Sequence, residues 1–67
     1  MKVTVKQAAS LIGASDDFVR IAMQQNRLPI GSAVKMSNRW AYNIQPGLLA
    51  DYLSITRKEL EWLIQKL

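Results

Sequence analysis

Residues 4–27 read TVKQAASLIGASDDFVRIAMQQNR, and the first half of this stretch has the start and stop signals of one short helix. Thr4 and Gln7 stand at the spacing of a capping box, in which each side chain binds the other residue's backbone amide. Apolar residues follow at helical spacing until Gly13, which supplies the left-handed residue that ends many helices. The pattern predicts a helix over residues 5–12.

A second helix start follows almost at once. Ser15 is a good N-cap, and the two acidic residues after it favour the positive end of a helix dipole. Pro29 forbids continuation, so we expect this helix over residues 16–26. Two short helices joined by a tight glycine-containing turn predict a helix-turn-helix. The expected core face of the second helix holds Phe18, Ile21 and Ala22, with Val19 as a fourth candidate.

Two strands are expected over residues 32–36 and 39–44, because large apolar side chains alternate with smaller or polar ones in the second of them. A two-residue turn would place Met36 opposite Arg39, whereas a three-residue turn places Met36 opposite Trp40. Only the three-residue turn gathers the large apolar side chains on one face, and a slip of one residue would reverse that arrangement. We therefore predict the three-residue turn. The predicted apolar face holds Val34, Met36, Trp40, Tyr42 and Ile44.

The tip of this hairpin has two interpretations. Lys35 and Arg39 can reach phosphates or a minor groove, or they only blunt the open edges of a two-stranded sheet. Trp40 and Tyr42 offer a base-stacking platform like that of single-strand binders, but a chain this small needs its aromatic side chains inside. We therefore expect both aromatic residues in the core.

The remaining chain predicts two more helices. Pro46 suits the first turn of the third, while Thr56 and Glu59 repeat the capping-box spacing at the start of a fourth. Trp62 lies on the far side of the fourth helix from its leucines, either as an anchor at an interface or because the helical wheel fails near a fraying end. Self-association or a protein partner through residues 54–67 is therefore one expectation. The predicted stripes are Leu48, Leu49, Tyr52 and Leu53 in the third helix and Leu60, Leu63, Ile64 and Leu67 in the fourth.

The composition limits the class of protein. A chain of 67 residues corresponds to one domain with a small core, which we place over residues 1–67. It contains no cysteine and no histidine, which excludes disulfides, thiolate metal sites and imidazole catalysis. The chain is also too small to enclose a deep ligand pocket. We expect a binding module and not an enzyme, with no catalytic residue, metal, cofactor or small-molecule substrate.

The charge indicates the kind of partner. Nine basic and five acidic residues give a formal net charge of +4, and six of the basic but only two of the acidic residues lie within residues 1–50. In the second helix Arg20 and Gln24 share a polar arc with Asp17 and Arg27. Arginine pairs with guanine and glutamine with adenine, so this arc has the chemistry to bind base edges. A plain solvated helix face is the alternative interpretation.

The order of these motifs resembles that of the excisionase-like and MerR-like helix-turn-helix domains. Residues 4–15 are similar to their Thr-x-x-x-Ala-Ala-x-x-x-Gly-x-Ser pattern, and residues 18–29 look like their second helix ending before Leu-Pro. Residues 39–53, which begin Arg-Trp, resemble the second wing strand and the short helix that follows it. The resemblance covers residues 3–53, and four weak motifs in the correct order are more specific than any one of them.

This resemblance implies an α+β winged helix-turn-helix, with the second helix in the major groove of double-stranded DNA and the hairpin as a wing. Members of the family act as recombination directionality factors or as small transcriptional regulators, here of a phage or mobile element. The rival interpretation is a phage antirepressor or adaptor that uses the same fold for a protein partner, with Trp62 at its interface. Residues 54–67 extend beyond the family module. The candidate DNA contacts are Lys6, Ser15, Arg20, Gln24, Arg27, Lys35, Asn38 and Arg39.

The start of the chain bears on localisation. No apolar segment follows Lys2, and no apolar run approaches the roughly 20 residues that span a bilayer. We therefore expect a cytoplasmic protein with no membrane partner.

Overall fold

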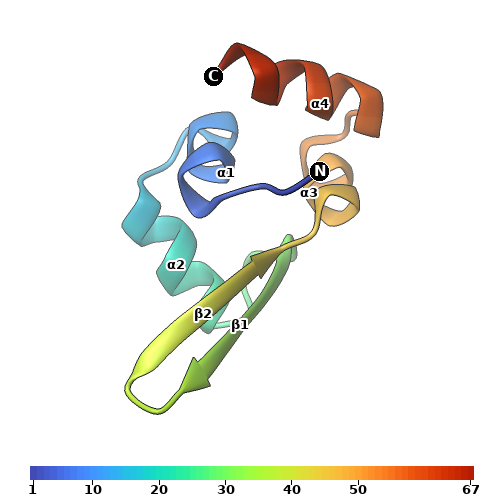
Figure 1. The fold of residues 1–67 in the computed structure, drawn as a ribbon. Coiled ribbons are helices and arrows are strands. Elements are labelled where there is room, and N and C mark those ends of the chain that lie inside the picture. Colours follow the sequence, from blue (N-terminus) through green and yellow to red (C-terminus); the bar gives the residue numbers. More distant parts are fainter.

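The computed structural model describes residues 1–67 and contains four helices and one two-stranded antiparallel hairpin (Figure 1). Their order along the chain is α, α, β, β, α, α, which confirms the predicted α+β layout of a winged helix-turn-helix. The elements are α1 (Val5–Ile12), α2 (Asp16–Gln24), β1 (Gly31–Met36), β2 (Arg39–Ile44), α3 (Pro46–Leu53) and α4 (Arg57–Lys66).

Local capping sets the boundaries of the first two helices. Thr4 Oγ1 accepts a hydrogen bond of 3.1 Å from the Gln7 amide, and Gln7 Oε1 accepts one of 3.0 Å from the Thr4 amide. Gly13 ends α1 with φ +84°, in the left-handed region. Ser15 Oγ then accepts a hydrogen bond of 3.1 Å from the Phe18 amide at the start of α2. The predicted capping box, glycine stop and serine cap are all confirmed.

α2 is shorter than predicted, because it ends at Gln24. Asn26 adopts φ +57°, and the Arg27 amide bonds back to the Ala22 carbonyl at 2.8 Å. Asparagine tolerates the left-handed region and commonly ends helices in this way. The chain therefore leaves the helix before Pro29 could interrupt it.

The predicted core face of α2 is confirmed at Ala22 and at the fourth candidate, Val19, and is wrong at Phe18 and Ile21. Val19 and Met23 are buried together with Ala22, whereas Phe18 and Ile21 are 54% and 52% exposed. The three main predicted residues and the three buried residues both have the i, i+3, i+4 spacing of a helical stripe, and the two sets overlap at Ala22. The contacts of α2 with α1 and with β1 select the second stripe.

The predicted three-residue hairpin turn is also wrong. The register pairs Met36 with Arg39 and Lys35 with Trp40, so the turn consists of Ser37 and the residue after it. Ser37 has φ +60°, and a positive φ at the first turn residue is shared by the primed turns of two-residue hairpins. Turns of this type match the right-handed twist of the two strands.

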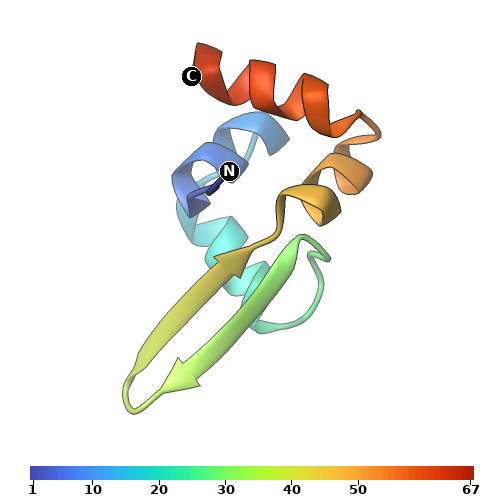
Figure 2. The same cartoon turned by 45° about the vertical axis from the view of Figure 1, so that its right-hand side comes forward.

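Contacts at the base of the hairpin set this register. Gly31 lies opposite Ile44, and a Cβ atom on Gly31 would collide with the Asn43 carbonyl. The Gln45 amide donates a 2.9 Å hydrogen bond to the Ile30 carbonyl just beyond the pair. The rest of the hairpin projects away from the helices (Figures 1 and 2), so near its tip there is no core against which an apolar face could pack.

The observed register distributes apolar side chains over both faces of the sheet. Val34 and Met36 lie on the face opposite to Trp40 and are 54% and 61% exposed. Tyr42 is half-buried against the core, as expected for a core aromatic residue. Trp40 is 39% exposed, so the expectation that it belongs to the core is wrong.

The core lies among the helices and at the base of the hairpin. Val3 forms an isolated bridge with Ile44, which attaches the N-terminal segment to the end of β2. α4 crosses the end of the molecule farthest from the hairpin tip (Figures 1 and 2), and its Leu60 is fully buried. The buried residues are Val3, Ala8, Ala9, Val19, Ala22, Met23, Leu28, Ile30, Ile44, Leu49, Ala50 and Leu60.

The stripes predicted for α3 and α4 are confirmed in part. One member of each stripe, Leu49 and Leu60, is buried, and three others are half-buried. Trp62 is 59% exposed although α4 continues to Lys66, so it lies off the stripe as predicted and the explanation by a fraying end is wrong. The exposed stripe residues are Leu48, Tyr52 and Leu67.

A membrane span would need a longer and more apolar helix than any in this structure.

Candidate nucleic-acid interface

The central part of the chain carries positive charge only. No acidic residue occurs between Asp17 and Asp51, and this stretch supplies all of α2 after its first two residues, the following loop, the whole hairpin and the start of α3. Arg20, on α2, is the one basic residue of this stretch that forms an ion pair, and its partners also lie on α2. The basic residues of the stretch are Arg20, Arg27, Lys35 and Arg39.

Arg20 is engaged locally. Its guanidinium lies 2.8 Å from an Asp17 carboxylate oxygen and 3.9 Å from one of Asp16, and its side chain is 40% exposed. Solvent-exposed pairs of this kind are worth about 0–1 kcal/mol. A phosphate or a guanine edge therefore has to outcompete only a weak contact to engage Arg20.

Gln24 has a structural partner that the sequence did not indicate. Its Nε2 donates a 2.6 Å hydrogen bond to the Tyr42 hydroxyl, which ties the end of α2 to β2. Gln24 is half-buried, in contrast to a freely solvated side chain. Any role of Gln24 in base contact competes with this hydrogen bond.

The hairpin presents its two basic residues on opposite faces. Lys35 pairs across the sheet with Trp40, and Arg39 pairs with Met36, and cross-strand partners share a face. Asn38 lies exposed in the turn between them. Each face of the tip thus combines one cation with one large apolar side chain.

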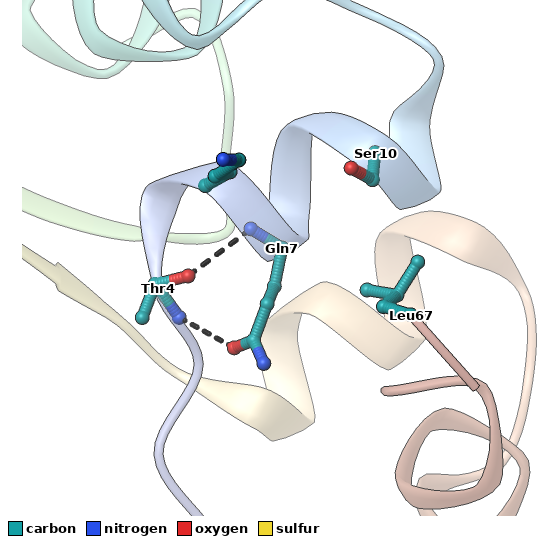
Figure 3. Close-up of a pocket in the computed structure, with 5 residues that line it drawn as sticks. Thr4, Gln7, Ser10 and Leu67 are labelled. Carbon is teal, nitrogen blue, oxygen red and sulfur yellow. Dashed lines mark hydrogen bonds between the residues drawn. The ribbon is translucent and has the colours of Figure 1, made fainter. Parts of the chain in front are cut away.

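Lys6 and Ser15 occupy different places from the hairpin cations. Lys6 lies on α1 and lines a shallow pocket of about 310 Å³ together with Leu67 at the end of the chain (Figure 3). This places Lys6 near α4 and not near the hairpin. Ser15 Oγ accepts the capping hydrogen bond of α2, which leaves its hydroxyl proton and one oxygen lone pair free for a further contact.

A groove that the sequence does not predict lies beside α2. It has a volume of about 320 Å³ and runs between the exposed side chains of Phe18 and Ile21 and the ring of Tyr52 on α3, with Arg27 on its rim. The groove was not predicted because Phe18 and Ile21 were expected to be buried in the core. The competing stripe of Val19, Ala22 and Met23 was the signal that these two side chains could face outward.

A second hollow that the sequence does not predict lies at the hairpin tip. It measures about 270 Å³ and is lined by Met36, Arg39, Trp40 and Ala41. It exists because the two-residue turn leaves the apolar side chains near the tip uncovered.

No group of three or more acidic, histidine or cysteine side chains in the chain is placed to hold a metal ion. Every buried side chain is apolar. The arrangement therefore offers two kinds of surface, the cationic hairpin with the end of α2 and the apolar groove beside α2. Comparison of the chain with models of protein families, with curated proteins and with solved structures finds no match.

Proposed function

We propose that this chain is a cytoplasmic DNA-binding protein that contacts double-stranded DNA through its hairpin and the second half of α2. The observation that carries the proposal is the long stretch between Asp17 and Asp51 that has basic but no acidic residues. Phosphates dominate the affinity of proteins for DNA, and a surface without carboxylates meets no local repulsion from them. The winged helix-turn-helix layout presents this stretch on an α-helix and a projecting ribbon, two elements that fit DNA grooves.

The resemblance to excisionase-like and MerR-like domains supports a role in a phage or mobile element. Under this proposal the chain is a recombination directionality factor or a small transcriptional regulator. Arg20 contacts base edges, while Arg27, Lys35 and Arg39 contact phosphates. Fold alone does not select between the two roles.

Fluorescence anisotropy of a labelled random-sequence duplex, titrated at several salt concentrations, tests the proposal. We expect log affinity to fall with log salt by roughly 0.9 for each phosphate contact. Arg39→Ala should reduce that slope by about 1. Arg57→Ala is the matched control, since it removes the same charge from α4, at the other end of the molecule from the hairpin tip.

Two results would contradict the proposal. Absence of binding at low salt would remove DNA as the partner, because non-specific affinity is the least that such a domain shows. An equal loss in Arg39→Ala and Arg57→Ala would mean that the hairpin is not the contact surface.

The groove beside α2 favours a second candidate, a protein–protein module such as an antirepressor or adaptor. Phe18, Ile21 and Tyr52 expose apolar surface there, and Asp16 and Asp17 at the start of α2 would repel phosphate. This candidate predicts no salt-dependent DNA binding. It also predicts association, seen in sedimentation velocity, that Ile21→Ser weakens and Arg39→Ala does not.

A further inference from the structure

The hairpin tip combines an exposed aromatic residue with two cations. Trp40 is 39% exposed and shares a sheet face with Lys35, its cross-strand partner. Arg39 and Met36, the latter 61% exposed, belong to the opposite face but line the same hollow as Trp40. The helices do not cover this part of the hairpin (Figure 2).

The charge around this hollow selects the chemistry of its occupant. The hairpin contains no carboxylate, so its apolar surface is framed by positive charge alone. A nucleotide offers the complementary combination, because a nucleobase is flat, aromatic and weakly hydrated while its phosphates are anionic. Binding sites for unpaired nucleotides combine aromatic platforms with basic grooves for this reason.

We propose that the hairpin tip is a base-stacking site, in which the Trp40 indole stacks on a nucleobase that has lost its stacking neighbour while Lys35 and Arg39 hold the adjacent phosphates. This inference rests on the proposed function, since it assigns to the same hairpin a contact with bases as well as phosphates. Such a base comes either from a single strand or from a flexible duplex step whose bases are unstacked on binding to the hairpin.

Trp62 provides an internal comparison. It is more exposed than Trp40, at 59%, but the Lys66 ammonium lies 5.2 Å from the centroid of its ring. That cation occupies one ring face, and α4 lies at the end of the molecule farthest from the hairpin tip (Figure 1). The Trp40 ring has no such cation over it, so it is the tryptophan that is open to a base.

Intrinsic fluorescence of the full chain separates the two tryptophans. Trp62→Phe leaves Trp40 as the sole tryptophan, and Trp40→Phe leaves Trp62. Each variant is titrated with oligo(dT) and with a duplex of alternating T and A, whose steps are easily unstacked. We expect saturable quenching in Trp62→Phe and no quenching in Trp40→Phe, because a nucleobase quenches an excited indole by electron transfer when the two rings are in contact.

Affinity supplies the second readout. Trp40→Leu should weaken binding to the favoured oligonucleotide by about fivefold to more than a hundredfold, the range that corresponds to the loss of one stacked base. Trp40→Phe should retain part of the affinity, since a phenyl ring still stacks. Trp62→Leu is the matched control and should bind like the parent chain. Circular dichroism tests whether each variant is folded. If Trp40→Leu is unfolded, the quenching experiment, which does not use that variant, still tests the proposal.

The outcomes distinguish the sources and the proposals. Quenching with oligo(dT) alone identifies single strands as the source, and quenching with the duplex identifies a step opened by the hairpin. Salt-dependent duplex binding without a change in Trp40 emission in either arm would overturn the stacking site and leave DNA binding intact. Equal quenching of Trp62 would also overturn it, and absence of all binding would overturn both proposals.

Discussion

Gln24 and Tyr42 are joined by a hydrogen bond of 2.6 Å between the amide nitrogen of one and the phenolic oxygen of the other. They are the single pair of side chains from different elements that is linked by a hydrogen bond. The bond is partly buried and connects the last residue of α2 to the middle of β2. The angle between the second helix and the hairpin therefore depends on it, together with the apolar contacts beneath.

Tyr42→Phe should lower the free energy of unfolding by about 0.5–1.5 kcal/mol, because it removes one hydrogen bond and leaves the Gln24 amide half-buried without its partner. Urea denaturation followed by circular dichroism measures the change. Tyr52→Phe is the matched control, since it deletes the same hydroxyl at an exposed site where no side-chain hydrogen bond is lost. Equal effects of the two substitutions would mean that the bond does not contribute to stability.

Gly13 and Gly47 offer a second matched pair. Gly13→Ala should destabilise the chain by about 1–2 kcal/mol, because a side chain at φ +84° is strained although there is open space for its Cβ. Gly47→Ala, within α3 and equally open, should stabilise it by up to about 1 kcal/mol. Thermal denaturation of the two variants should show shifts of opposite sign. A stabilised Gly13→Ala variant would contradict the left-handed end of α1.

The elements that the sequence predicts correctly depend on local interactions. The capping boxes at Thr4 and Thr56 and the left-handed Gly13 involve residues at most a few positions apart, so their patterns are visible without a tertiary structure. The core face of α2 is different, because two stripes one residue apart fit equally well. Only the packing partners decide that Val19 and not Phe18 is buried.

The hairpin register and the candidate site are only partly predictable from the sequence, because both depend on how far the hairpin extends beyond the core. The pattern rule assumes that a hairpin's apolar face is covered, but this hairpin projects beyond the core (Figure 1), and its base and turn set the register. The basic residues of the site are apparent from composition. That Lys35 and Arg39 lie on opposite faces, with Trp40 beside Lys35, follows from the register, and the exposure of Trp40 follows from the projection of the hairpin beyond the core.

Glu59 makes the stability of α4 sensitive to pH. The Thr56 amide donates a 2.9 Å hydrogen bond to the Glu59 carboxylate, and this bond, with help from the Thr56 hydroxyl, holds the pKa of Glu59 below its ordinary value of 4.5. The folded chain thus favours the deprotonated form. The contribution is complete above pH 4.5 and is lost as the pH falls through the lower folded value.

Glu59→Gln should therefore be less stable than the parent chain at neutral pH, and the difference should shrink in acid. Denaturation curves collected between neutral and strongly acidic pH measure it. Gln7→Glu is the reciprocal variant, since it converts the neutral capping box of α1 into an ionisable one and should add a new acid-sensitive contribution. A constant difference between Glu59→Gln and the parent at all pH values would contradict this assignment.

Asp17 provides a test of whether the start of α2 approaches DNA. Asp17→Asn removes a negative charge and releases Arg20 from its 2.8 Å ion pair. If α2 lies against phosphates, affinity for a random duplex at low salt should rise by about 1.5- to 5-fold, the range expected for one exposed charge pair. Anisotropy at several salt concentrations measures the gain, which added salt should diminish.

Asp51→Asn is the control for this experiment, because it makes the same change in net charge on α3, outside the proposed contact surface. A gain confined to Asp17→Asn supports an approach of α2 to the duplex. Equal gains in both variants would show a response to net charge only, without a defined orientation. A loss of affinity in Asp17→Asn would mean that the Asp17 contact positions Arg20 for binding, and would contradict the view that it competes with phosphate.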